Sequence, residues 1–194
     1  MSAARIFPLM TLEEFEALPE PKGDFTYELH FGRLVKVGRP KKLHHLLQWS
    51  IWAALRQVLD PAKWFSSMEL AYNLVEGYDA RAADVAVVSH ERFDKVPDDG
   101  CLTVSPELVV FVKSRSNRDT QIDRDAVECL THGARAVWYV KQNPQVVCVY
   151  TAAGKKEYRP GQTIALPASI GGRVKVADIY KASSRRIAAA MRSE

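Results

Sequence analysis

The stretch LVVFVKSRSNRDTQIDRDAVECLTHGARAVWYV, residues 108–140, decides the fold class of this chain. It opens with Leu108 to Val112, which is apolar at both alternating positions, as in a strand covered on both faces. Apolar residues then recur at helical spacing from Ile122 to Leu130 and stop before Gly133, a residue type that favours helix ends. A second apolar run, Ala136 to Val140, follows at once. We therefore predict a strand–helix–strand unit with a right-handed crossover inside a mixed α/β domain.

The segments on either side predict further helices and hairpins. Upstream we expect a short helix capped by Thr11 and Glu14, a hairpin over 25–37 that turns near 30–32, a long helix over 43–59, strands at about 64–75 and 82–88, and a loop over 89–105. Downstream we expect a hairpin that includes 146–150 and 156–158, and a terminal helix over 178–191. The result is an α/β domain with a mixed central sheet, flanking helices and added hairpins.

Length and composition bound the class of protein. A chain of 194 residues, 47% hydrophobic and 26% charged, fits one soluble domain over 1–194, with a core of about 11–180 and a basic tail at 181–194. No apolar run approaches the ~18 residues of a membrane span, and the start of the chain does not resemble a secretory signal. Three scattered cysteines argue against a disulfide framework or a structural zinc site, and a reducing cytoplasm is the simplest location. The net charge of +4 suits a polyanionic partner without proving one.

Two polar residues interrupt the apolar strands. Asp84 lies near the head of ADVAVV (83–88), where burying a carboxylate is costly unless it is paired or binds a metal. Lys113 ends the strand that starts at Leu108 and shares a face with Phe111, because positions two apart on a strand point the same way. A carboxylate and a lysine at adjacent strand ends suit phosphoryl chemistry, in which the acid holds a divalent metal and the lysine offsets phosphate charge or positions water. A structural ion pair at the sheet edge explains both residues equally well.

Two tryptophans mark a second feature, on the long helix. Trp49 and Trp52 lie on a stripe beside the main apolar face. We expect both to belong to the core, and the alternative is a protein contact surface, where exposed tryptophan is a typical anchor.

Five segments in order carry a family resemblance. They are YELHFGRL (27–34), His44 at the start of the long helix, RAADVAVV (81–88), PELVVFVKS (106–114) and GARAVWYV (133–140). Together they resemble a large bacterial restriction endonuclease family of the PD-(D/E)XK nuclease superfamily, over about residues 11–180. The resemblance implies a restriction endonuclease-like fold, often dimeric, and a DNA endonuclease that uses Mg²⁺ or Mn²⁺. It also implies that Asp84 is the first metal ligand and Lys113 the active-site lysine, with Glu28 and His44 at the rim.

The chain departs from the family pattern at this site. The second metal ligand of the family, a glutamate, falls on Phe111, whose ring cannot bind Mg²⁺ because that ion requires oxygen ligands. Further family residues are replaced by Ala83, Arg115, Asp125, Cys129 and Ala136. These replacements cluster around the expected site, whereas the apolar positions of the strands and helices still match the family pattern. We therefore predict a retained fold with an impaired or rebuilt site.

Several residues are candidates for the missing carboxylate. Asp125 could supply it from the helix after the Phe111 strand, although a solvated helix charge is the favoured interpretation. Glu69 could face the site or the surface. Glu107 lies roughly 13 Å from Phe111 along its strand, too far to replace it. We expect Cys129 to be a small core residue rather than a nucleophile.

Three functions remain open on the sequence. The first is a Mg²⁺- or Mn²⁺-dependent nuclease completed by an unorthodox carboxylate, and the second is an inactive nuclease fold that binds nucleic acid or a protein. The third is an interaction module that uses the Trp49 and Trp52 face. Because Asp84 and Lys113 alone sum to zero charge, they can pair directly, and we expect weak or no metal binding at rest.

Overall fold

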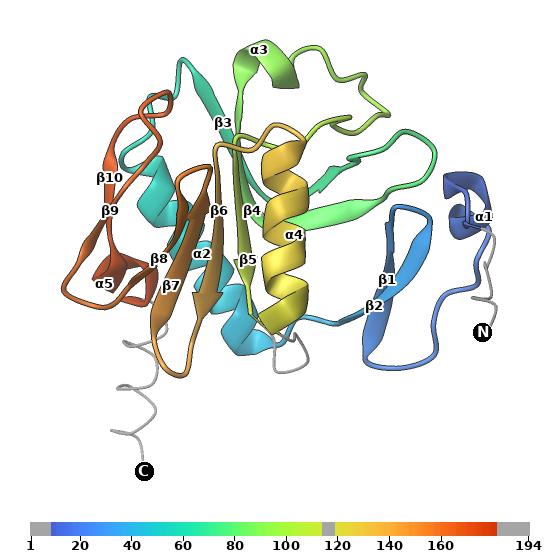
Figure 1. Ribbon diagram of the computed structural model, residues 1–194, viewed down its shortest axis with the longest axis horizontal. Coiled ribbons are helices and arrows are strands. Elements are labelled where there is room, and N and C mark those ends of the chain that lie inside the picture. The colour runs from blue at the N-terminus through green and yellow to red at the C-terminus, as the bar shows by residue number, and fades with distance from the viewer. Residues whose placement is uncertain (1–8, 114–118, 182–194) are drawn as a thin grey trace, which may run out of the picture.

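The computed structural model describes residues 9–113 and 119–181, which form a central sheet with a helix on each face (Figure 1). Its elements in chain order are α1 (Leu12–Glu16), β1 (Phe25–His30), β2 (Arg33–Gly38), α2 (Lys42–Arg56), β3 (Trp64–Tyr72), β4 (Arg81–Ser89), α3 (His90–Phe93), β5 (Leu108–Val112), α4 (Asp119–Thr131), β6 (Ala136–Lys141), β7 (Val146–Thr151), β8 (Gly154–Tyr158), β9 (Thr163–Ala165), β10 (Arg173–Lys175) and α5 (Val176–Ile179). No helix within the described ranges has the length and apolarity that a membrane crossing requires.

The central sheet confirms the predicted mixed α/β class. Its six strands lie in the order β3-β4-β5-β6-β7-β8. Strands β5 and β6 are parallel, with Val110 opposite Trp138, and α4 connects them, while the other neighbours are antiparallel. The apolar runs at 108–112 and 136–140 are therefore the two central parallel strands, and both lie buried between helices.

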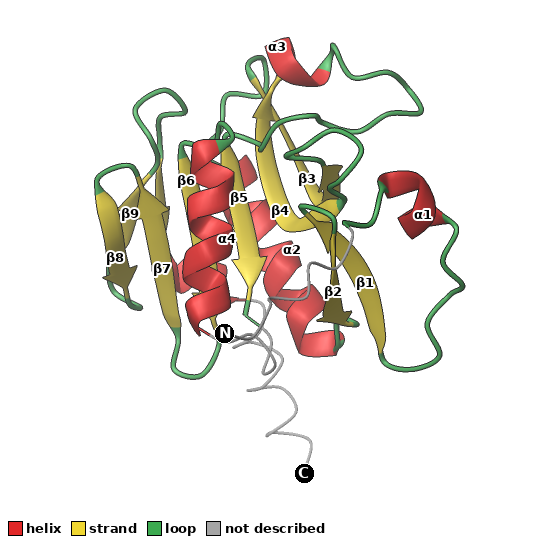
Figure 2. Cartoon of the chain, turned by 45° about the vertical axis from the view of Figure 1, so that its right-hand side comes forward, coloured by secondary structure: helices red, strands yellow, loops and turns green. Residues whose placement is uncertain are grey.

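Two apolar cores lie on opposite faces of this sheet, as Figure 2 shows for α2 and α4. The α2 core contains Leu47, Ile51 and Leu55 of the helix, packed on alternate residues of β4, β5 and β6. The α4 core contains Ile122 and Ala126 together with the intervening strand residues. Cys129 belongs to this second core and is fully buried, as predicted.

The hairpin β1–β2 lies beside the sheet and turns tightly at Phe31 and Gly32. Both residues have positive φ values, 50° and 71°, as a type I′ hairpin turn requires. A side chain at Gly32 would meet the Cβ of Leu9 at 2.6 Å, so only glycine fits there. Backbone hydrogen bonds between Leu29 and Ala80 fasten the hairpin to the segment before β4. This attachment brings the end of β1 close to the sheet.

Some local expectations need correction. Trp49 is 53% exposed because no described element covers its side of α2, so its core assignment is wrong. Trp52 is partly buried and donates from Nε1 to the Ser66 carbonyl, which confirms its core assignment. The expected loop at 89–105 contains the short helix α3, and an additional hairpin, β9–β10, packs its buried residues on the α2 core. The terminal helix predicted over 178–191 and the basic tail at 181–194 lie mostly outside the described residues.

Candidate active site

A cavity of about 900 Å³ opens between the β1–β2 hairpin and one end of the sheet. Its described lining comes mainly from α1, both hairpin strands, the start of α2, β3, the start of β4, the end of β5, the start of α4, and β6. Asp84, Glu28 and His44, all predicted site residues, line this cavity. Lys113 is not among its described lining residues.

Asp84 lies where β4 begins to separate from β5, just before the paired residues Val85 and Val110. Its Oδ2 accepts a hydrogen bond from the backbone N–H of Val112 at 2.6 Å. Its Oδ1 lies 2.6 Å from Nε2 of His44 and accepts from the Gln48 amide at 2.9 Å. The Asp84 side chain is only 17% exposed, so these contacts stabilise a carboxylate that burial would otherwise disfavour.

Glu69 of β3 adds a second carboxylate to this group. It lies between Met68 and Leu70, which pair with residues on either side of Asp84. Its φ of 53° is in the left-handed region that residues other than glycine rarely adopt, and such strain tends to concentrate at functional sites. The Gln48 amide also donates to Glu69 Oε1 and so connects the two carboxylates. Ligand atoms of His44, Glu69 and Asp84 all lie within 4.8 Å of one another.

The environment of His44 favours its protonated form. Burial alone lowers the pKa of His44, but the hydrogen bond and charge of Asp84, with the charge of Glu69, raise it above its ordinary value. His44 lies in the first turn of α2, one turn before Gln48, so both side chains reach Asp84 from one helix face.

Phe111 lies in β5, the strand neighbouring that of Asp84, and Lys113 directly follows this strand. The half-buried Phe111 ring lines the cavity, and its centroid is 5.0 Å from that of Tyr139. Lys113 continues the parallel pairing, because its N–H donates to the Val140 carbonyl at 2.9 Å. His44 is a charged partner of Asp84, with its Nε2 2.6 Å from Oδ1.

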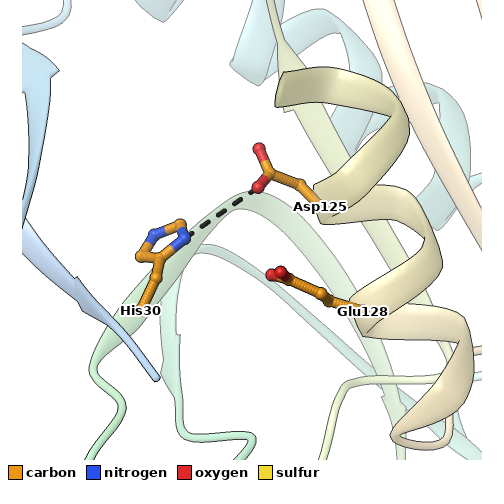
Figure 3. A group of neighbouring side chains, drawn as sticks. All are labelled: His30, Asp125 and Glu128. Atoms are coloured by element: carbon orange, nitrogen blue, oxygen red, sulfur yellow. Dashed lines mark ion pairs between the residues drawn. The ribbon is translucent and has the colours of Figure 1, made fainter. Parts of the chain in front are cut away.

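A second polar group, His30, Asp125 and Glu128, lies between β1 and α4 (Figure 3). His30 is held between two carboxylates: Nε2 lies 2.7 Å from Glu28 and Nδ1 lies 3.9 Å from Asp125. Asp125 is only 7% exposed and accepts hydrogen bonds from Tyr139 and Gln121. The expectation of a solvated charge at Asp125 is therefore wrong. Burial raises the pKa of Asp125, and its neighbours oppose part of the shift.

The cation of this second group is Arg81, a residue of the protein itself. Its guanidinium binds the fully buried Asp79 through Nε and Nη2, and its Nη1 donates to Glu128 at 2.7 Å. Burial alone lowers the pKa of Arg81, but the hydrogen bonds of Asp79 and Glu128 raise it further above its already high value. With Arg81 bound to Glu128, this group is better suited to joining β1, β4 and α4 than to holding a metal ion.

Glu28 belongs to the same wall of the cavity. Its Oε1 accepts from the backbone N–H of Ala82 at 3.3 Å, two residues before Asp84, and its Oε2 contacts His30. Glu28 therefore bridges the hairpin and β4 at the cavity wall, and its role at the rim of the active site stays a prediction. The carboxylate candidate Glu107 is buried elsewhere, paired with Ser89 and Arg92.

The comparisons with known proteins agree with this fold. Residues 12–176 match the Uma2 family, described as "Putative restriction endonuclease", and the chain belongs to this family. A crystal structure of a "putative nuclease belonging to DUF820" from Anabaena variabilis aligns with a TM-score of 0.73 and 21% identity, covering 89% of this chain and 98% of that one. At this identity the alignment shows a shared fold. No curated protein matches the chain.

Proposed function

We propose that this protein is a divalent-metal-dependent DNA endonuclease of the PD-(D/E)XK type with a rebuilt active site. In this proposal Glu69 of β3 replaces the carboxylate that the family carries at the position of Phe111. The proposal rests on one observation: the ligand atoms of His44, Glu69 and Asp84 converge within 4.8 Å at a cavity wall.

The donor set fits the cation that the family implies. Two carboxylates suit Mg²⁺ and Mn²⁺, and an imidazole also suits Mn²⁺. When bound, such a cation would offset charge on a phosphate and lower the pKa of a water molecule.

The chain's own residues have distinct tasks. The Gln48 amide orients both carboxylates, and the Val112 N–H fixes the second oxygen of Asp84. Lys113 takes the role of the family lysine at the end of β5, where its charge would favour a bound phosphate.

A second candidate function is an inactive nuclease fold that binds nucleic acid. It is favoured by the complete set of partners around Asp84, whose two oxygens already accept from His44, Gln48 and Val112. A buried carboxylate with these hydrogen bonds is less destabilised in the absence of a metal than one without partners. Salt-dependent DNA binding without cleavage would support this candidate over the nuclease. The expected homodimer and cytoplasmic location stay predictions, and light scattering after size-exclusion chromatography tests the first.

Glu69→Gln is the variant that tests the rebuilt site. The amide keeps the shape of the side chain but removes one negative ligand. We expect Mn²⁺ affinity, measured by calorimetry, to fall by at least the 10- to 100-fold that is typical of losing an outer-shell partner. Glu91→Gln is the matched control, because Glu91 is 84% exposed on α3. Unchanged Mn²⁺ binding in Glu69→Gln would remove Glu69 from the site.

Metal binding should depend on pH through His44. Protons compete with the metal for a histidine ligand, so Mn²⁺ affinity should fall by up to about tenfold per unit as the pH drops below the His44 pKa. The pKa of His44 is higher in the folded state than in the unfolded state, where it is about 6.5. In chelator, the His44–Asp84 pair therefore contributes its full stabilisation at pH values below about 6.5. Its contribution is lost as the pH rises through the folded pKa. Calorimetry over a pH series checks the expectation, and His44→Gln should flatten the profile.

Phe111→Glu restores the family ligand. The variant loses roughly 1–2 kcal/mol of apolar burial and places a carboxylate near Asp84, so its melting temperature in chelator should fall. Mn²⁺ should recover part of the loss because it binds only the folded state. If Phe111 is what limits activity, the variant should also nick plasmid DNA faster than the wild type. A variant that neither responds to Mn²⁺ nor nicks would mean that other departures, such as Arg115, already disable the site.

A further inference from the structure

The cavity extends beyond the Asp84 group to a wall for which the proposed chemistry has no use. Phe111 contributes its half-buried ring to this wall, one residue before the Val112 N–H that binds Asp84. Tyr139 packs beside the ring at a tilt of 32°. Gln121 and Asp125 of α4 line the same part of the cavity, where they bond to each other. An aromatic surface thus lies between the proposed metal ligands and a hydrogen-bonding group.

The size of the cavity limits what can enter it. Its volume of about 900 Å³ lies within the range of pockets that enclose small organic ligands, roughly 300–1,000 Å³. One nucleotide fits such a volume. A base that is stacked and paired inside a B-form duplex does not enter such a cavity unless it is flipped out of the stack. A duplex could touch the mouth of the cavity, whereas an unstacked nucleotide could reach Phe111.

The charges of the lining point to a base rather than a second phosphate beside Phe111. Among the described residues the lining holds five carboxylates and three permanently basic side chains, Glu16, Glu28, Glu69, Asp84 and Asp125 against Lys36, Arg81 and Arg124. An additional phosphate near Asp125 would meet like charge. A neutral base carries N–H donors, which carboxylate and amide oxygens accept, and its face can stack on an aromatic ring.

We propose, building on the proposed function, that the cavity holds one unstacked nucleotide of a DNA strand, with its base against the Phe111 ring and its phosphate toward Asp84. The preferred substrate is then single-stranded or locally opened DNA, not an intact duplex. Phe111 acts as the stacking surface that makes this choice. Stacking of this kind tolerates different bases, because every base presents a π-face.

Binding assays with Ca²⁺, a hard cation that carboxylate oxygens also hold, test the proposal by affinity alone and offset the phosphate charge beside Asp84. Fluorescence anisotropy compares a labelled single strand, the duplex of the same sequence and a free mononucleotide. We expect the single strand to bind most tightly. Phe111→Leu keeps an apolar side chain but removes the ring, and it should weaken single-strand binding by about 5- to 150-fold, the range for losing one base stack. Trp49→Leu is the matched control, because Trp49 is an exposed aromatic residue that does not line the cavity, and it should leave the affinity unchanged.

A second readout reports stacking itself. An oligonucleotide that carries the fluorescent base 2-aminopurine should change its emission when the base stacks on Phe111, and this change should be absent in Phe111→Leu. Equal affinity for strand and duplex, equal affinity for the mononucleotide, or an unchanged Phe111→Leu variant would each overturn the proposal. Ring-dependent binding by a protein that never cleaves would leave this inference standing and remove the nuclease. Cleavage of duplex DNA that depends on Asp84 but is unchanged by Phe111→Leu would support the nuclease and overturn this inference.

Discussion

Asp84→Asn is expected to abolish metal-dependent cleavage, with a loss of about a thousandfold or more in plasmid nicking. Asp84 is the proposed ligand with the most contacts: its oxygens meet His44, Gln48 and the Val112 N–H. The amide removes the negative charge and turns one oxygen into a donor, which faces other donors. A bound metal stabilises the charge on the phosphate in the transition state by several kcal/mol. Each 1.36 kcal/mol of lost stabilisation lowers the rate about tenfold, so a loss of about a thousandfold is expected.

A supercoiled plasmid assay with Mn²⁺ measures the loss, and Asp94→Asn is the control. Asp94 is 70% exposed and follows α3, so its charge is removed without touching the cavity. Cleavage that survives in Asp84→Asn would rule out the proposed site, whatever the wild-type rate.

Arg81→Ala is expected to have the largest effect on stability, a loss of about 3–5 kcal/mol. It leaves Asp79 fully buried without its cation and frees Glu128 from its 2.7 Å partner. The same Asp79 carboxylate accepts from the backbone N–H groups of Phe31 and Leu74, so the hairpin attachment should weaken as well. Since domains of this kind are stable by about 5–15 kcal/mol, the variant approaches the limit of folding.

Urea unfolding followed by circular dichroism measures this loss. Arg159→Ala, a change at a 60% exposed arginine, should stay close to the wild type. Because the cost arises from an unpaired buried charge, the double variant Arg81→Met with Asp79→Asn should regain part of the stability. A loss below about 1 kcal/mol in Arg81→Ala would mean that Asp79 finds another partner.

The apolar spacing of the chain predicted most of the architecture, because that signal is local. Residues 108–112 and 136–140 are apolar at both odd- and even-numbered positions, so both faces of each strand are apolar. In the structure these segments are the central parallel strands. The capping box at Thr11 and Glu14 starts α1 as expected, since both partners lie within one turn. Asp84 could be singled out because a carboxylate in an apolar strand needs a partner, wherever that partner lies.

The sequence offered His44 and Glu69 as candidates, but it could not decide which side chains meet Asp84, because they come from separate elements. Glu69 reaches Asp84 across the sheet, by a strand register and a positive φ that no local pattern encodes. Gln48 could have been found from the sequence, because it lies four residues after His44 and therefore on the same face of the helix. The residues next to Asp125 in the sequence are typical of an exposed helix face. Its carboxylate is buried because β6 and the β1–β2 hairpin bring Tyr139 and His30 against it.

The sequence by itself therefore determined the sheet, its two covering helices and the carboxylate at Asp84, because burial follows from the spacing of apolar residues along each element. Only the tertiary structure decided that Trp49 is exposed, that Asp125 is buried, and that Glu69 of β3 supplies the second carboxylate beside Asp84. These outcomes depend on which elements meet in space. Contacts between elements are set by sheet register and hairpin attachment over the whole domain.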